Sequence, residues 1–268
     1  MQPVLTIRPW LAVLRLGAFG LITVLAAPVQ LLLIALRSTA AERLPVWYHT
    51  QVLKLIGFRV VVTGTPTRAR PALLVCNHTS YMDIMVLGSV MPLTFIAKSE
   101  VATWPGFGLL AKLQRTVFVD RRRSSTGTQR DVIAERITAG EALMLFPEGT
   151  TNDGNRVLPF KSALFAVAES GGADLPVQPI SLAYTRLDGI PLGRAFRPFI
   201  AWFGDMDLGP HLWQLLGMGV ITAEVHFHPP VTLTAVGGRK PLAKHCESTV
   251  AQGVEALLSG RALPAASA

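Results

Sequence analysis

Near its N-terminus the chain carries a stretch that is long and apolar enough to cross a bilayer. Leu16 to Leu36 contains no charged residue. As a helix this run would extend roughly 31 Å, close to the thickness of a hydrocarbon core. Arg15 and Arg37 flank it, so its orientation is weakly specified. Pro28 predicts a kink or two half-helices. We therefore expect residues 1–57 to form a membrane-associated helical motif.

Two alternatives apply to this N-terminal region. Small residues follow the apolar run at 38–41, as after a signal peptide, although the run is longer than a usual signal h-region and Pro28 would split it. A second apolar stretch, Leu44 to Phe58, contains Trp47 and a lone charge among its later residues, Lys54. It fits either an interfacial helix or a helix packed on the core, and the sequence leaves both open.

Composition narrows the class of protein. Half of the 268 residues are apolar, only 16% are charged, and the net charge is +8. Such a chain is too apolar to be disordered, and its charged fraction lies below the roughly 25% of ordinary soluble domains. The positive charge favours an anionic membrane surface or substrate. Nucleic acid is not expected as a partner, because aromatic residues make up 7% and no recognised binding module is present.

The remainder of the chain is predicted to be one α/β domain over residues 58–260, a mixed central sheet flanked by helices, with a frayed tail at 261–268. Apolar runs predict strands, and longer periodic runs predict helices between them. The strands are expected at 58–62, 72–76, 93–97, 116–119, 142–146, 177–183 and 220–227, and the helices at 80–90, 102–113, 125–139, 162–169 and 243–258. Cys76 and Cys246 are expected to be buried thiols.

The first candidate site follows the predicted strand 72–76, in the segment Asn77-His78-Thr79-Ser80-Tyr81-Met82-Asp83. In the plain interpretation, Ser80 and Asp83 only cap the next helix. In the functional one, Asp83 reaches back to one imidazole nitrogen of His78 and leaves the other free as a base. No enzyme nucleophile is needed if the substrate brings its own hydroxyl group.

The second candidate site follows the predicted strand 142–146. The segment Phe146-Pro147-Glu148-Gly149-Thr150 continues into a polar loop that reaches Gly154. Loops at strand ends are where α/β folds place their ligands, although the same composition also fits an ordinary turn.

These segments together resemble the glycerophospholipid acyltransferase family. NHTSYMD resembles its histidine-x4-aspartate motif and FPEGT its third motif, while RTVFVDR (115–121) and VQPI (177–180) resemble the second and fourth. The resemblance implies a membrane-bound O-acyltransferase of the 1-acylglycerol-3-phosphate type. It would move an acyl group from acyl-CoA or acyl carrier protein, as co-substrate, to a lysolipid hydroxyl.

The resemblance also assigns residues. It implies that His78 is the general base and that Asp83 orients it, with backbone N–H groups near the helix start holding the oxyanion. It implies further that the acceptor is bound by Lys98, Arg121, Glu148, Gly149, Thr150 and Thr151. No cofactor and no metal site are expected. The catalytic domain would lie on the cytoplasmic face of the plasma (inner) membrane.

One position departs from the family pattern. The family commonly has an arginine directly after Gly-Thr, and this chain has Thr151. Loss of that arginine would remove a bidentate phosphate partner, which Arg156 or Lys161 would have to replace. A lyso-ornithine lipid, with an amino acid as head group, is therefore the alternative acceptor. The segment 146–165 resembles that subgroup too.

Three further features remain open. The apolar residues Trp104, Pro105, Phe107 and Leu109 fit an acyl tunnel, a membrane contact or plain core. His226 and His228 would share a strand face, but no other ligands cluster with them in the sequence. A hydrolase is disfavoured because no Gly-x-Ser-x-Gly occurs, whereas a noncatalytic lipid-binding protein would not need His78 and Asp83.

Overall fold

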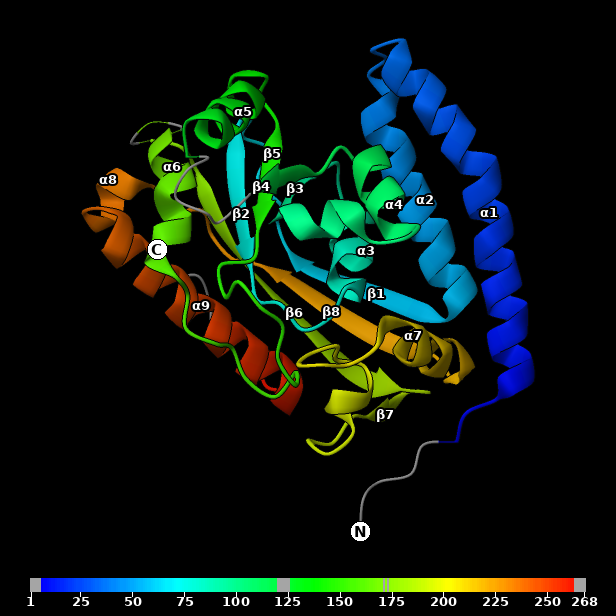
Figure 1. Ribbon diagram of the computed structural model, residues 1–268. Helices are drawn as coiled ribbons and strands as arrows, with labels where there is room; N and C mark the ends of the chain where they lie inside the picture. Colours follow the sequence, from blue (N-terminus) through cyan, green and yellow to red (C-terminus); the bar gives the residue numbers. More distant parts are fainter. Residues whose placement is uncertain (1–5, 120–125, 171, 173, 263–268) are drawn as a thin grey trace.

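A mixed sheet forms the centre of the computed structural model, which describes residues 6–119, 126–170, 172 and 174–262 (Figure 1). The expected α/β fold is confirmed. In the described part the strand order is β1-β8-β6-β2-β5-β3-β4, and β7 pairs with β6. The five strands from β6 to β4 are parallel, β8 is antiparallel to β6, and β1 is parallel to β8. The strands are β1 Phe58–Gly64, β2 Ala72–Cys76, β3 Thr94–Lys98, β4 Val117–Val119, β5 Ala142–Leu145, β6 Val177–Leu187, β7 Ile190–Pro191 and β8 Ile221–Phe227.

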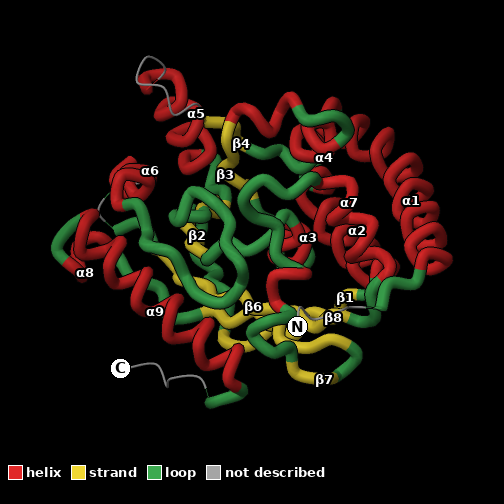
Figure 2. Tube along the Cα trace, turned by 60° about the horizontal axis from the view of Figure 1, so that its bottom comes forward, coloured by secondary structure: helices red, strands yellow, loops and turns green. Residues whose placement is uncertain are grey.

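The central strands are apolar on both faces, because helices cover both. Every residue of β2 and β5 is buried. Side chains alternate across a strand, so Leu74 and Met144 join one core while Leu73 and Leu143 join another. The first core is covered by α1 (Pro9–Ala35), α2 (Ala40–Ile56), α3 (Met82–Gly88) and α7 (Leu208–Gly217), and the second by α5 (Thr126–Thr138), α6 (Ala166–Ser170), α8 (Leu233–Val236) and α9 (Arg239–Ser259) (Figure 2).

Helix α1 buries polar side chains and exposes apolar ones, the reverse of a helix on the surface of a water-soluble protein. Its buried side chains include Arg15 and Gln30. Nη1 of Arg15 donates to the carbonyl oxygens of Leu216 and Met218, at 3.1 and 2.7 Å. Large apolar side chains are exposed instead: Trp10, Val13, Leu14, Leu16, Leu21, Val24, Leu25, Val29, Leu31 and Leu32. Among the described residues, α1 is the one helix long and apolar enough to cross a membrane.

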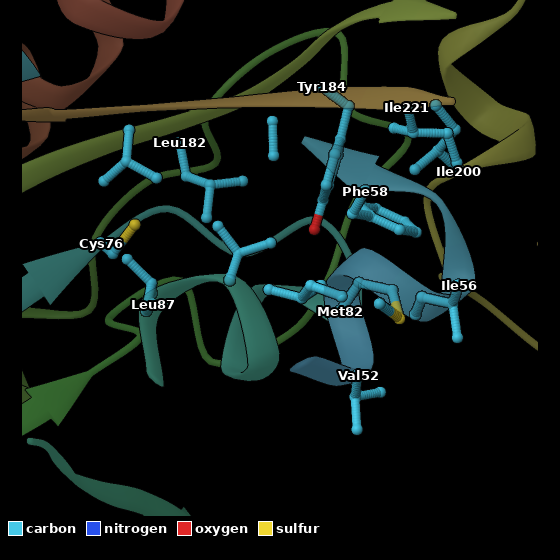
Figure 3. Packing of buried hydrophobic residues seen from close by; sticks show 14 of the residues in the cluster. Val52, Ile56, Phe58, Cys76, Met82, Leu87, Leu182, Tyr184, Ile200 and Ile221 are labelled. Carbon is cyan, nitrogen blue, oxygen red and sulfur yellow. The ribbon is translucent and has the colours of Figure 1, made fainter. Parts of the chain in front are cut away.

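The N-terminal motif differs from expectation in one respect. Helix α1 continues through Pro28 as a single helix, so the expectation of two half-helices is wrong. Its neighbour α2 packs on the core: Val52 and Ile56 lie in the same cluster as Phe58 and Met82 (Figure 3). Of the two interpretations of this stretch, the helix packed on the core is therefore confirmed. Trp47 of α2 is exposed.

Most predicted elements are present with shifted ends. The expected helix at 102–113 is instead a 3-10 helix, η1 (Ser99–Thr103), followed by α4 (Phe107–Leu113). Gly106, with a φ of 72°, separates the two. The expected helix at 162–169 begins as the 3-10 turn η3 (Ser162–Phe165) before α6. Cys76 and Cys246 are buried free thiols, as predicted. Most of the expected tail, residues 263–268, lies outside the described residues.

Candidate active site

The two candidate loops meet at one edge of the sheet. Strands β2 and β5 are parallel neighbours, with Val75 paired to Leu145, so the segments that follow them emerge side by side. The first segment carries His78 and the second Glu148. Lys98 ends β3 at the same edge, because β3 is the parallel neighbour of β5. The topology thus brings together three of the predicted site residues that lie far apart in sequence.

His78 and Asp83 form the hydrogen-bonded pair that the spacing predicted. Nδ1 of His78 lies 2.8 Å from Oδ2 of Asp83. Asp83 is fully buried in the first turn of α3, whereas the His78 side chain is 19% exposed. The imidazole stacks on Phe146, with ring centroids 4.1 Å apart. With Nδ1 engaged, Nε2 is the ring nitrogen left to accept a proton, as a general base requires.

Asp83 receives three further donors. Its Oδ2 accepts the N–H groups of Thr79 and Ser80, at 2.6 and 3.0 Å. Its Oδ1 accepts the hydroxyl of Tyr184, a buried residue of β6, at 2.6 Å. Asp83 therefore binds the segment that leads into α3 and also orients His78, so it does more than the plain interpretation allowed. Four donors around one buried carboxylate offset the cost of removing it from water.

Glu148 joins the second loop to the first. Its Oε1 accepts the N–H of His78 at 2.8 Å, and its Oε2 accepts Nδ2 of Asn152 and the N–H of Leu158, at 2.8 and 3.0 Å. Nδ2 of Asn152 also donates to the carbonyl oxygen of His78 at 3.2 Å. The Glu148 carboxyl is almost completely buried, and burial raises its pKa to about 7. These contacts fix the backbone that carries His78.

The backbone N–H groups just before α3 are already engaged. Those of His78, Thr79 and Ser80 all donate to carboxylates. The expectation that N–H groups at the helix start hold an oxyanion therefore does not apply to these three residues.

The remaining predicted site residues lie at the surface or outside the described part. Lys98 and Thr150 are exposed, and Thr151 is partly exposed. Gly149 adopts a φ of 70°, which a residue with a Cβ rarely adopts. Arg121 lies outside the described residues. In the sequence it comes two positions after Val119, the last residue of β4.

Tyr184 and Asn152 were not singled out from the sequence. Tyr184 lies beyond the fourth motif, on a strand that continues to Leu187. Its burial raises its pKa well above the usual value, and the charge of Asp83 adds to this, so the phenol keeps its proton and acts as the donor. A tyrosine at alternating spacing in a strand is an ordinary core residue in sequence, so no sequence signal distinguishes this one.

The structure locates the apolar residues at 104–109 and the histidines of β8, whose roles the sequence left open. Trp104 contacts Trp202 and Phe107 contacts Tyr81, with ring centroids 5.7 and 6.4 Å apart, while Leu109 is 55% exposed. Trp104 and Phe107 are partly buried and belong to neither of the two core clusters, and Leu109 lies at the surface. Nδ1 of His226 bonds Thr63, and Nε2 of His228 bonds Ser181.

Comparisons with known proteins identify the family of this chain. The family model described as Acyltransferase matches residues 59–183. A lyso-ornithine lipid O-acyltransferase of Brucella abortus is 48% identical over 97% of this chain and 99% of that protein. A 1-acyl-sn-glycerol-3-phosphate acyltransferase of Neisseria gonorrhoeae is 35% identical over 61% of this chain and 62% of that one. The crystal structure of the 1-acyl-sn-glycerophosphate acyltransferase from Thermotoga maritima shares the fold, with a TM-score of 0.61 and 24% identity, covering 81% of this chain and 79% of that one.

The chain therefore belongs to the acyltransferase family that contains these lipid-modifying enzymes. Within that family it is an acyltransferase of the lysophospholipid type.

Proposed function

We propose that the protein is a lyso-ornithine lipid O-acyltransferase. Among the two acceptors considered, this one is favoured by the match along nearly the whole length of the Brucella abortus relative, whereas the match to the glycerol-phosphate enzyme covers about three fifths of the chain. Thr151, where the family commonly has arginine, is consistent with an acceptor that lacks a phosphate. The 1-acylglycerol-3-phosphate acceptor is thus the less well supported of the two.

The observation that carries the catalytic assignment is the bond between Nδ1 of His78 and the buried Asp83. In the proposed reaction, Nε2 of His78 takes the proton from the acceptor hydroxyl while the hydroxyl oxygen attacks the thioester carbonyl of acyl-CoA or acyl carrier protein. The tetrahedral intermediate then collapses and its C–S bond breaks. The imidazolium returns the proton to the departing thiolate. No acyl-enzyme is formed, and no cofactor takes part.

Asp83 and Glu148 act on this reaction through His78. Asp83 fixes the ring orientation and stabilises the imidazolium. Glu148 is a positioning residue, since its bonds hold the His78 backbone. Lys98 and Arg121, with Gly149, Thr150 and Thr151, are proposed to contact the acceptor.

The N-terminal motif, residues 1–57, is proposed to hold the enzyme on the membrane that contains its lipid acceptor. The support is the outward-facing apolar surface of α1, which water would solvate poorly. We place the enzyme on the plasma (inner) membrane with the catalytic domain, residues 58–260, on the cytoplasmic side, where acyl thioesters are available.

An acceptor panel tests the proposed function. The purified full chain in mixed micelles is given a radiolabelled acyl thioester, as CoA or carrier-protein conjugate, with lyso-ornithine lipid, with 1-acyl-sn-glycerol-3-phosphate, or with neither. We expect label in an O-acylated ornithine lipid and a higher kcat/KM for that acceptor. Transfer to the glycerol phosphate alone would contradict the acceptor assignment. Release of free fatty acid without an acceptor would indicate a hydrolase instead.

A further inference from the structure

A group of mixed charge lies beside the His78 loop, on residues outside the four motifs. Asp153 and Arg156 belong to the loop after β5, and Arg194 and Arg197 belong to the segment between β7 and α7. Arg197 begins the 3-10 helix η4 (Arg197–Phe199). We call these four residues the charged cluster.

Packing places the charged cluster against Thr79, the residue after His78. A Cβ built on Gly154 would lie 3.1 Å from Cγ2 of Thr79 and 3.6 Å from Cβ of Arg197. The segment that carries Arg197 is tied to the same loop, because the N–H of Trp202 donates to the carbonyl oxygen of Thr79 at 3.0 Å. On the other side of Gly154, Asn152 bonds the carbonyl oxygen of His78.

A narrow, partly open cavity lies at this junction, and its volume of about 10 Å³ is roughly that of one water molecule. Its lining includes Arg156, Arg197, Thr79 and Tyr184. Arg197 is only partly satisfied: Nη1 donates to Oδ1 of Asn155 at 3.2 Å and Nη2 to the carbonyl oxygen of Leu258 at 3.4 Å. Among the described residues, its Nε is buried and has no hydrogen-bond partner. A buried donor of this kind is stabilised by a ligand that brings an acceptor.

Charges of both signs lie in and beside the cavity. Burial alone would raise the pKa of Asp153, but its bonds to Asn155 and the charges of Arg156 and Arg194 outweigh burial and lower it, so the carboxylate is ionised at neutral pH. Arg156 and Arg197 line the cavity, whereas Asp153 and Arg194 lie outside its lining. Asn155 connects Asp153 to Arg197, because its Nδ2 donates to Oδ2 of Asp153 and its Oδ1 accepts Nη1 of Arg197. An acceptor with two negative charges would be repelled by Asp153, whereas a head group with one carboxylate and one ammonium matches both signs.

We propose that the mouth of this cavity binds the carboxylate of the acceptor's amino-acid head group, and that the rest of the head group lies outside it, over the charged cluster. The guanidinium groups of Arg197 and Arg156 would hold the carboxylate, and Asp153 would face the ammonium group. Arg194 would add positive potential from the rim. This inference rests on the proposed function and extends it, because it names the residues that select an ornithine head group over a glycerol phosphate. It also places the head group near Thr79, the residue that follows the proposed base in the sequence.

The test compares two acceptors on matched variants. One acceptor is lyso-ornithine lipid and the other is the same lipid with its carboxylate converted to a carboxamide. For the wild type we expect KM to be about 10- to 100-fold higher for the carboxamide, as loss of a charge-assisted bond implies. Arg156→Gln, an exposed position, and Arg197→Lys, which keeps charge and stem but not the guanidinium fork, should raise KM for the natural acceptor. In both variants the difference in KM between the two acceptors should become smaller, and kcat should change little.

Arg59→Gln is the matched control, because it removes one exposed arginine on β1, at the other side of the sheet, and should leave the acceptor ratio unchanged. Asp153→Asn should improve use of 1-acyl-sn-glycerol-3-phosphate relative to lyso-ornithine lipid. Suppose that the wild type acylates lyso-ornithine lipid and that both arginine variants keep the wild-type ratio of KM values for the two acceptors. That result overturns the cavity assignment alone. A wild type that acylates only the glycerol phosphate overturns the proposed acceptor and this inference together.

Discussion

The hydroxyl of Tyr184 donates to Oδ1 of Asp83 across 2.6 Å, from a strand 101 residues further along the chain. The other oxygen of Asp83 serves His78 and two backbone N–H groups. The orientation of the proposed base is thus set jointly by the start of α3 and by β6. A residue outside the recognisable motifs completes the surroundings of the aspartate.

Tyr184→Phe should lower kcat and stability together. It removes one donor from a buried carboxylate while keeping the ring that packs against Phe58. Loss of a hydrogen bond to a charged group costs about 1.5–3 kcal/mol, so we expect a similar fall in the free energy of unfolding and a decrease in kcat of roughly tenfold. Urea unfolding and steady-state kinetics measure the two. Tyr48→Phe is the control, because its hydroxyl bonds Thr23 away from the site. An unchanged kcat in the Tyr184 variant would show that the tyrosine is only structural.

His78→Ala should abolish acyl transfer while membrane binding persists. Removal of a general base typically lowers the rate by about 10²- to 10⁴-fold. Transfer of labelled acyl groups and co-sedimentation with vesicles measure the two properties on one preparation. Turnover within about threefold of the wild type would exclude His78 as the base.

Glu148 should make stability depend on pH in an unusual direction. Its pKa in the folded protein, about 7, lies above the ordinary value of 4.5, so the folded state binds this proton more tightly than the unfolded state. The resulting stabilisation is fully present below about pH 4.5 and is lost as the pH rises through 7. Glu148→Gln lacks this titration. The Tm of the wild type minus that of Glu148→Gln should therefore fall between pH 5 and pH 8.

The control for that experiment is Glu255→Gln, because Glu255 is exposed on α9. Its Tm difference from the wild type should stay flat over the same range. A Tm difference for Glu148→Gln that is flat or rises with pH would show that Glu148 is charged throughout.

Polar substitutions on the outer face of α1 should weaken vesicle binding and leave the fold intact. Leu21 and Leu25 are each 63% exposed, so replacing both by serine removes little internal packing. Burial of a leucine side chain contributes about 1.5–3 kcal/mol, so the pair should lower the vesicle partition coefficient by at least about tenfold. Flotation on liposomes measures the loss, and circular dichroism checks the fold. The control is Val132→Ser, on α5 at the other face of the sheet, which should bind vesicles as the wild type does. If the Leu21/Leu25 variant also binds vesicles as the wild type does, α1 is not the membrane contact.

The sequence predicted the elements better than the contacts between them. The strand 72–76 and the helix after it were placed from a short apolar run and a capping pattern, and the His78–Asp83 bond follows from their local geometry. The short strand β7 and helix α7 gave no clear periodic signal. Glu148 and Tyr184 act through partners on other strands, so their roles depend on the order β6-β2-β5, which no local pattern encodes. The break at Gly106 was missed although the dipeptide Pro105-Gly106 marks a turn in the sequence.

The attachment of α1 has a consequence for how the enzyme would meet a bilayer. Because Arg15 fastens this helix to the end of α7, and Gln30 donates to the carbonyl oxygens of Ala41 and Leu113, its outer face has a fixed direction relative to the sheet. A protein tethered by a flexible linker would sample many heights and tilts above the lipid. If α1 lies in the membrane as proposed, the height of His78 over the membrane plane would be set by the same contacts that hold the fold together.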